Sequence, residues 1–131
     1  MFHLSKALVF ECKEALLTKK ADILNRLQLI RVDFQTRDKG KDETDLSMNN
    51  IAETQFVHTS KNLRSILLEI ESALSRIENK TYGVCEETFE EIEINRLKSI
   101  PWTRLSIEGA EIREALKSRY RNPKLRLLTN I

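Results

Sequence analysis

Cys85 and Thr88 are separated by two residues, and Ser106 and Gly109 repeat this spacing further along the chain. Two cysteine pairs with such a spacing hold a structural Zn²⁺ ion through four thiolates. Here only Cys85 can supply a thiolate, because Thr88, Ser106 and Gly109 occupy the other three positions. His3 and His58 lie far from Cys85 in the sequence and do not complete a metal site. We therefore expect a finger-like unit that folds without metal, in which Cys85 is a buried remnant; a reactive thiol is the alternative, which requires exposure and a lowered pKa.

The two segments that precede this unit carry one apolar residue every seven positions. The first column is Phe2, Val9, Leu16, Ile23 and Ile30, with Leu27 and Phe34 beside it. The second column is Phe56, Leu63, Ile70 and Ile77, with Leu67 and Leu74 beside it. A sustained seven-residue apolar period is typical of helices that pair along a seam. The pattern predicts helices over residues 4–36 and 44–79, each roughly 50 Å long at 1.5 Å per residue.

A polar turn around Gly40 joins the two predicted helices. Its length suits antiparallel neighbours. The sequence therefore predicts a mainly α fold, with a long antiparallel coiled-coil hairpin over residues 1–80 whose tip lies at residues 37–47. Residues 81–131 are expected to form a small, metal-free, degenerate zinc-finger-like globule and a C-terminal helix.

Apolar residues of the globule must replace the stabilisation that zinc supplies in small fingers, which is on the order of 10–16 kcal/mol. The candidates are Phe89, Ile92, Ile94, Leu97, Ile100, Trp102, Leu105 and Ile107. Phe89 and Trp102 are expected to be the main anchors. Gly83 is expected to end the second helix, since glycine adopts the left-handed conformation of many helix C-termini. Residues 91–94 alternate as in a strand, and residues 107–120 are expected to be helical.

Composition limits the classes of partner. Lys and Arg total 22 against 20 Asp and Glu, so net charge does not favour binding to nucleic acid or to a membrane surface. No run of apolar residues is long enough to span a bilayer. The N-terminus does not resemble a signal peptide, and the two cysteines form no disulfide framework, so a reducing cytoplasm is expected. No helix-turn-helix or base-reading motif is present, and we expect no sequence-specific DNA binding.

The segment that holds Cys85 resembles the zinc-finger region of the DksA/TraR family of bacterial RNA polymerase regulators. The matching residues are Tyr82, Gly83, Cys85, Glu91, Ile92, Arg96, Leu97 and Pro101. Upstream, Asp42, Asp45 and Ser47 resemble the family's tip motif, Asp-x-x-Asp-x-Ala. The two motifs lie at a matching separation and together cover about two thirds of the chain. The chain is thus identified as a variant of the family that lacks the zinc-binding cysteines.

The resemblance implies a function at the far end of the hairpin. In the family, the hairpin enters the secondary channel of RNA polymerase and brings its acidic tip close to the catalytic centre. By resemblance, Asp42 and Asp45 are the acting residues, and Ser47 replaces the small alanine. Arg37, Lys39, Lys41 and Arg96 are candidate auxiliary contacts, with solvated turn residues as the alternative for the first three. The protein is expected to be a monomer that acts on polymerase, is not an enzyme and needs no cofactor.

Some family members also help to form a site for guanosine tetraphosphate, using basic side chains that this chain does not share. Glu69, Ile100 and Ala110 stand at those positions. None of the three can bind a phosphate group through a positive charge. We therefore expect synergy with this alarmone of the stringent response to be lost or weak.

Two other functions are compatible with the same residues. A coiled-coil adaptor without a polymerase role would use the hairpin only as an interaction surface. A transcript-cleavage factor would use two tip acids to hold a catalytic magnesium ion. Cleavage of RNA by stalled polymerase distinguishes the second alternative from a regulator of initiation.

Overall fold

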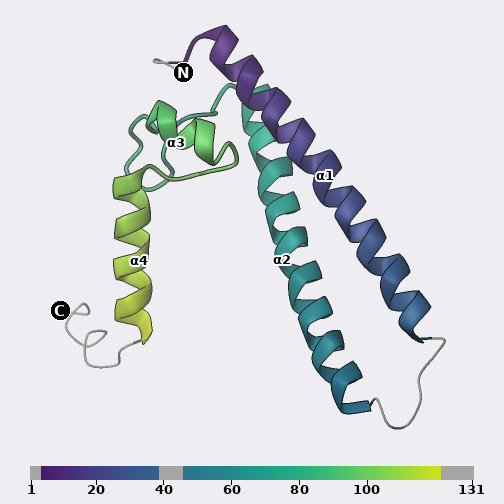
Figure 1. Ribbon diagram of the computed structural model, residues 1–131. Coiled ribbons are helices and arrows are strands. Elements are labelled where there is room, and N and C mark those ends of the chain that lie inside the picture. The colour runs from purple at the N-terminus through teal and green to yellow at the C-terminus, as the bar shows by residue number, and fades with distance from the viewer. Residues whose placement is uncertain (1–3, 39–45, 122–131) are drawn as a thin grey trace.

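The computed structural model describes residues 4–38 and 46–121, and within these ranges the side chains outside residues 37–50. Its helices are α1 (Lys6–Asp38), α2 (Leu46–Glu78), α3 (Ile94–Ser99) and α4 (Ile107–Arg121). Helices α1 and α2 run antiparallel as a long hairpin, and a small globule that contains α3 sits at one end of it (Figure 1). Helix α4 leaves the globule and lies apart from the hairpin. The predicted hairpin, globule and C-terminal helix are confirmed.

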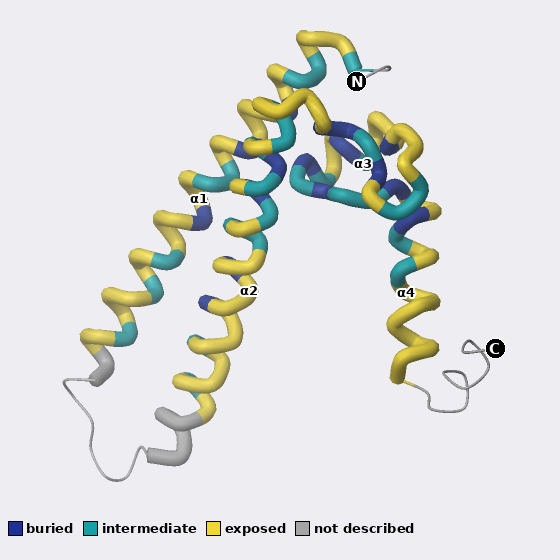
Figure 2. The backbone as a smooth tube through the Cα atoms, turned by 180° about the vertical axis from the view of Figure 1, so that it is seen from behind, coloured by how far each residue is buried: buried dark blue, intermediate teal, exposed yellow. Residues whose placement is uncertain are grey.

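The seam between α1 and α2 is built mainly from the predicted heptad residues, with Cys12 and Ala73 as buried residues that were not predicted. Leu16 and Ile23 of α1 and Leu63 and Ile70 of α2 are buried, and their column neighbours pack against them with partial burial. Buried residues lie along the facing sides of the two helices, and the outer sides are exposed (Figure 2). Phe2, the first residue of the predicted column, lies outside the described residues. Near the far end, the rings of Phe34 and Phe56 stack with centroids 4.6 Å apart.

Helix α1 begins with a side-chain cap that the sequence analysis did not identify. The hydroxyl of Ser5 accepts a hydrogen bond from the backbone N–H of Leu8 at 3.1 Å. Serine is among the preferred residues at this position because its side chain pairs with a backbone N–H group that the helix leaves unpaired. The cap explains why the helix begins at Lys6, two residues later than the heptad pattern suggests.

Helix α2 ends at Glu78. The prediction that Gly83 ends this helix is therefore wrong. Lys80 adopts the left-handed conformation with φ of 61°. The N–H of Thr81 bonds to the carbonyl of Arg76 at 2.9 Å, and the N–H of Lys80 bonds to the carbonyl of Ile77 at 3.3 Å. This pair of bonds is the Schellman motif, which satisfies the last carbonyl groups of a helix. Gly83, with φ of 89°, instead belongs to the turn of the globule, where its carbonyl accepts the N–H of Ile92 at 2.8 Å.

The prediction of a strand over residues 91–94 is wrong, because only Glu91 takes part in a strand-like pairing. Within the described chain, the only pairing of strand type here is a single antiparallel bridge between Val84 and Glu91. Ile94 already begins α3. The alternating pattern of residues 91–94 therefore reflects one bridge followed by a helix start, since Ile92 is buried and Ile94 is partly exposed.

The core of the globule differs from the one predicted. Ile92 and Leu97 are fully buried, and Trp102 and Leu105 pack against the core. Phe89, a predicted anchor, is 81% exposed, and Ile94 and Ile107 also face solvent. Tyr82, which was not among the predicted core residues, is the largest fully buried side chain, and its hydroxyl donates to the carbonyl of Pro101 at 2.7 Å.

Candidate functional site

The predicted tip residues lie where α1 ends and α2 begins. Asp42, Asp45, Lys39 and Lys41 fall outside the described residues. Arg37 and Ser47 belong to α1 and α2, but their side chains are not among those described. The end of α1 and the start of α2 both lie at the end of the hairpin that is further from the globule (Figure 1). Each arm has 33 residues, so the far end of the described hairpin lies about 50 Å from its base at 1.5 Å per residue.

The globule brings the four degenerate zinc positions together around one sulfur atom. Cys85 is fully buried, and its Sγ accepts a hydrogen bond from the N–H of Thr88 at 3.5 Å. A Cβ atom placed on Gly109 would collide with this Sγ and would lie 3.3 Å from the hydroxyl oxygen of Ser106. The sulfur of Cys85 therefore occupies the volume that a side chain at residue 109 would need.

Ser106 has a second role as the cap of α4. Its hydroxyl oxygen accepts a hydrogen bond from the N–H of Gly109 at 3.0 Å. The N–H of Ile107, also in the first turn, donates to Oε2 of Glu93 at 3.3 Å. The position that holds a thiolate in a metal-binding finger thus holds a helix-capping hydroxyl here. This explains why α4 begins directly after Ser106.

The surroundings of Cys85 favour its thiolate form. Burial alone raises the pKa of this thiol, but hydrogen bonds from Ser106 and Thr88 outweigh burial and lower the pKa to about 6. Hydrogen bonds to the charged form of an acid favour that form. In this site, hydrogen-bond donors take the place that a cation has in a metal-binding finger. The lowered pKa alone does not make the thiol reactive, because Cys85 has no exposed surface.

The donor set of the cluster does not fit a structural zinc ion. It offers one sulfur atom and two hydroxyl groups, and Gly109 has no side chain. Zinc in such sites takes four ligands, mainly thiolate and imidazole. Over residues 4–38 and 46–121, His, Cys, Asp and Glu side chains form no group of three or more that could hold a metal ion.

Arginine side chains attach the globule to α2. The guanidinium of Arg104 donates from Nε to Oε2 of Glu69 at 2.8 Å and from NH2 to the hydroxyl of Ser72 at 2.9 Å. Arg76, from α2, donates to the carbonyl groups of Trp102 and Thr103 at 3.3 Å each. Burial, followed by the neighbouring Arg104, lowers the pKa of Arg76. The globule is therefore fixed to the hairpin by polar contacts as well as by the apolar core.

Arg96, a predicted auxiliary contact, and Glu69, which stands at a position of the alarmone site, are both engaged within the molecule. Arg96 donates from Nε to the carbonyl of Leu105 at 2.8 Å, which links α3 to the segment before α4. Glu69, one of the positions considered for the alarmone site, is paired with Arg104. The role of Arg76 and Arg104 was missed in the sequence analysis. Their signal is weak, because the partners are 26 to 35 residues away in the sequence.

Together, the long antiparallel hairpin and a small finger-like globule at its base define a class of coiled-coil hairpin proteins with a degenerate zinc finger. Within the described ranges, no helix is long and apolar enough to cross a membrane. No family model matches the chain.

Two relatives match most of the chain. An uncharacterized protein of Aquifex aeolicus is 37% identical over 113 residues, covering 82% of this chain and 77% of that protein. The RNA polymerase-binding transcription factor DksA of Caulobacter vibrioides is 30% identical over 103 residues, covering 78% of this chain and 68% of that protein. The chain therefore belongs to the DksA family.

A solved structure shows the same fold. The transcription factor DksA2 of Pseudomonas aeruginosa superimposes with a TM-score of 0.81 at 24% sequence identity, over 88% of this chain and 90% of that structure. The superposition extends over most of both chains, so the arrangement in Figure 1 is also that of this solved structure.

Proposed function

We propose that this protein is a transcription regulator that binds bacterial RNA polymerase and acts through the tip of its hairpin in the secondary channel. The observation that carries the proposal is the relationship to DksA of Caulobacter vibrioides, a protein named for RNA polymerase binding, over 68% of that protein's length. The hairpin supports it, because two paired helices of 33 residues each make a long and narrow probe.

The acting residues in this proposal are Asp42 and Asp45. Carboxylates carried by a narrow probe into a partly dry channel interact with basic side chains or metal ions more strongly than they do at an open surface. Ser47 is close in size to the alanine of the family motif and is expected to be accommodated. The globule remains outside the channel and, in this proposal, determines how deeply the hairpin is inserted.

The proposal is tested with the paired substitution Asp42→Asn and Asp45→Asn. Purified polymerase and a promoter that forms short-lived open complexes are used, and the change in transcript yield caused by the protein is measured. The double variant is expected to lose this effect by on the order of tenfold, because the acidic contacts are removed, while it still binds polymerase. Replacing exposed acids on the side of α1, Glu11→Gln and Asp22→Asn, is the matched control and should leave the effect unchanged.

Three outcomes are separable. If the unaltered protein does not bind polymerase, the proposed function itself is wrong, and a coiled-coil adaptor is favoured. If it binds and the tip variant acts normally, only the role assigned to Asp42 and Asp45 is wrong. If the unaltered protein stimulates RNA cleavage in stalled elongation complexes, it is a transcript-cleavage factor rather than a regulator of initiation.

A further inference from the structure

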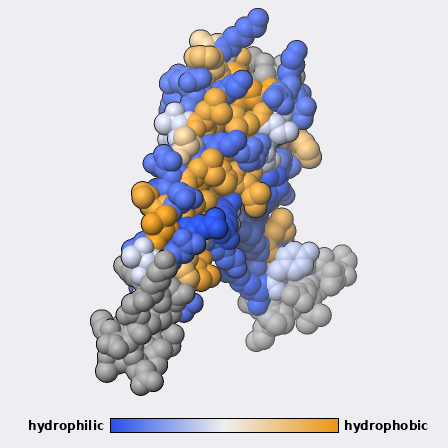
Figure 3. Space-filling model, turned by 90° about the vertical axis from the view of Figure 1, so that its right-hand side faces the viewer, coloured by the Kyte–Doolittle hydropathy of each residue, from blue (hydrophilic) through white to orange (hydrophobic). Residues whose placement is uncertain are grey.

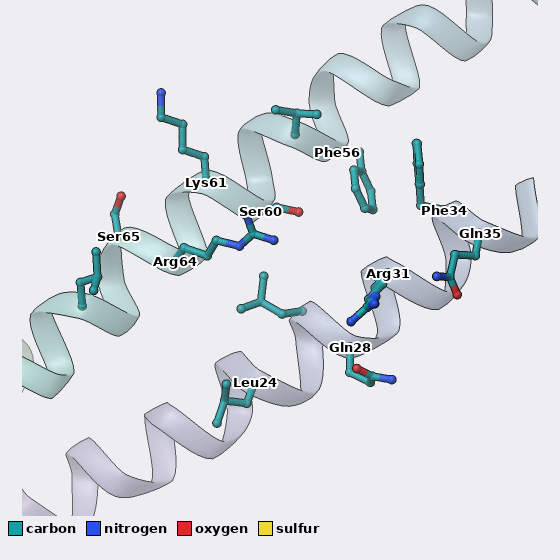
Figure 4. Close-up of a pocket in the computed structure, with 13 residues that line it drawn as sticks. Leu24, Gln28, Arg31, Phe34, Gln35, Phe56, Ser60, Lys61, Arg64 and Ser65 are labelled. Carbon is teal, nitrogen blue, oxygen red and sulfur yellow. The ribbon is translucent and has the colours of Figure 1, made fainter. Parts of the chain in front are cut away.

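One flank of the hairpin contains a groove that the tip proposal does not use. The cavity has a volume of about 950 Å³ and is lined by residues of both α1 and α2. Figure 4 shows the groove between the two helices, with the stacked rings of Phe34 and Phe56 at one end. It lies on the half of the hairpin that is further from the globule, where the two helix axes diverge (Figure 1).

The groove residues repeat at the spacing of a helix-docking surface. Helix α1 contributes Leu24, Gln28, Arg31 and Gln35, and helix α2 contributes Val57, Lys61, Arg64 and Leu68. Both sets follow the steps i, i+4, i+7 and i+11, so each forms one straight stripe along its helix. Two parallel stripes at the side of a two-helix seam are the surface on which a third helix packs in a bundle.

The apolar members of the groove are exposed to an unusual degree for such large side chains. Leu68 is 69% exposed, Val57 is 57% exposed and Leu24 is 47% exposed. The hairpin also carries hydrophobic surface between hydrophilic margins where it is viewed from its α1 side (Figure 3). Clustered exposed apolar residues with a polar rim are typical of interaction sites.

The charge of the groove has one sign. Arg31, Lys61 and Arg64 line it, and no Asp or Glu does. None of the ion pairs within the described ranges involves these three cations. Arg31 and Arg64 point from opposite helices into the space between them, and Lys61 extends outward from α2 (Figure 4). An occupant must therefore combine an apolar stripe with negative charge beside it.

We infer that this groove docks an amphipathic helix of a partner protein, with acidic residues on both sides of its apolar stripe. The apolar floor favours a protein helix over single-stranded nucleic acid, which binds by stacking bases on accessible aromatic rings. The two aromatic rings of the groove stack on each other at an interplanar angle of 24°. The site is separate from the tip, so the inference does not depend on how Asp42 and Asp45 act.

A second copy of this chain matches the groove less well, because its exposed apolar helix surfaces carry charges of both signs. Ile112 of α4 has Glu111 on one side and Arg113 on the other, and Arg113 is paired with Glu87. Phe10 of α1 has Glu11 and Glu14 as well as lysines near it. A helix with only acidic residues beside its apolar stripe complements the groove better, so a partner protein is the favoured occupant and self-association is an outcome of the test.

The test uses the full chain and a fluorescein-labelled helical peptide of about 20 residues, with leucines at i, i+4, i+7 and i+11 and glutamates beside them. Fluorescence anisotropy should show that the protein binds this glutamate peptide more tightly than the same peptide with lysine in place of glutamate. The variant Arg31→Glu with Arg64→Glu should weaken binding by on the order of tenfold and reverse the preference between the peptides. Leu68→Ala should also weaken binding of the glutamate peptide, without a change in melting temperature, because the side chain is largely exposed.

The matched control reverses two cations on the opposite flank of α1, Lys19→Glu with Arg26→Glu, and should bind as the unaltered protein does. Equal binding of the two peptides, or an equal loss in the control variant, would overturn the inference. The inference would also be overturned if a labelled single-stranded oligonucleotide bound the unaltered protein more tightly than the glutamate peptide does, and if the variant Arg31→Glu with Arg64→Glu lost this binding. Sedimentation showing a dimer that Leu68→Glu dissociates would overturn it as well, because the groove would then be a self-interface.

Discussion

Sγ of Cys85 lies in the space where residue 109 would place a side chain if it were not glycine. The collision with a Cβ atom involves a sulfur on a short, fully buried side chain, which has little room to move. Ser106 and Thr88 hold the same sulfur by hydrogen bonds. Glycine is therefore required here by packing, and its helical position in the first turn of α4 does not itself demand it.

Gly109→Ala is expected to destabilise the protein by about 1–3 kcal/mol, the usual cost of adding a methyl group to a filled interior. The free energy of unfolding is measured by urea denaturation. Combining Gly109→Ala with Cys85→Ala should recover most of the cost of the glycine substitution, because the second change removes the sulfur that blocks the new methyl group. Additive effects of the two substitutions would show that the predicted collision does not determine the cost.

For single residues, the sequence predicted which side chains come together better than it predicted how exposed each side chain is. The spacing of Cys85, Thr88, Ser106 and Gly109 was visible in the sequence, and the structure brings these residues together. The exposure of Phe89 was not predictable from its hydrophobicity. Phe89 lies in a tight turn with φ of 59°, and its backbone N–H donates to the carbonyl of Cys85 at 2.9 Å. This turn directs the ring into solvent.

Among the elements, the hairpin was the most predictable part of the fold. A seven-residue apolar period over many turns specifies both the helices and the sides on which they meet. The ends of the helices were less predictable, since Lys80 takes the left-handed position that Gly83 was expected to fill. The attachment of the globule to α2 was not predictable, because Arg76 and Arg104 give no periodic signal and their partners are distant in the sequence.

The contribution of this attachment is tested with Arg104→Met. The substitution keeps much of the side-chain volume and removes the hydrogen bonds to Glu69 and Ser72. A loss of about 1–3 kcal/mol in the free energy of unfolding is expected, because hydrogen bonds to charged groups are stronger than neutral ones and Glu69 loses its partner. Arg26→Met, at an exposed site on α1, is the matched control and should have little effect. A result within about 0.5 kcal/mol of this control would show that the apolar core alone fixes the globule.

The molecule as a whole combines a long, solvated hairpin with a small base whose stability comes from side-chain packing and capping. Tyr82, Ile92 and Leu97 fill the base, and Ser106 caps the helix that leaves it. In metal-binding fingers the ion supplies much of the folding free energy. We expect such a base to fold without an ion, because many side chains of the globule share the work that one ion does in a metal-binding finger.

We therefore expect the purified protein to contain no stoichiometric zinc and to keep its melting temperature in the presence of a chelator. Metal analysis and thermal denaturation with and without the chelator measure the two quantities. Loss of a structural zinc ion would remove on the order of 10 kcal/mol and would unfold the globule. One zinc ion per chain, or a melting temperature that falls in chelator, would contradict the expectation.

The contact between Cys85 and Gly109 also has a consequence for how such a chain can change over generations. Cysteine at residue 109 alone would place its Cβ against the neighbouring sulfur, and cysteine at residue 88 or 106 alone would remove a hydroxyl group that bonds to this sulfur. We expect each of these single substitutions to be harmful before any ion can bind, so a four-cysteine site can arise only if several positions mutate together. A chain with this packing is therefore expected to diversify without acquiring a zinc site.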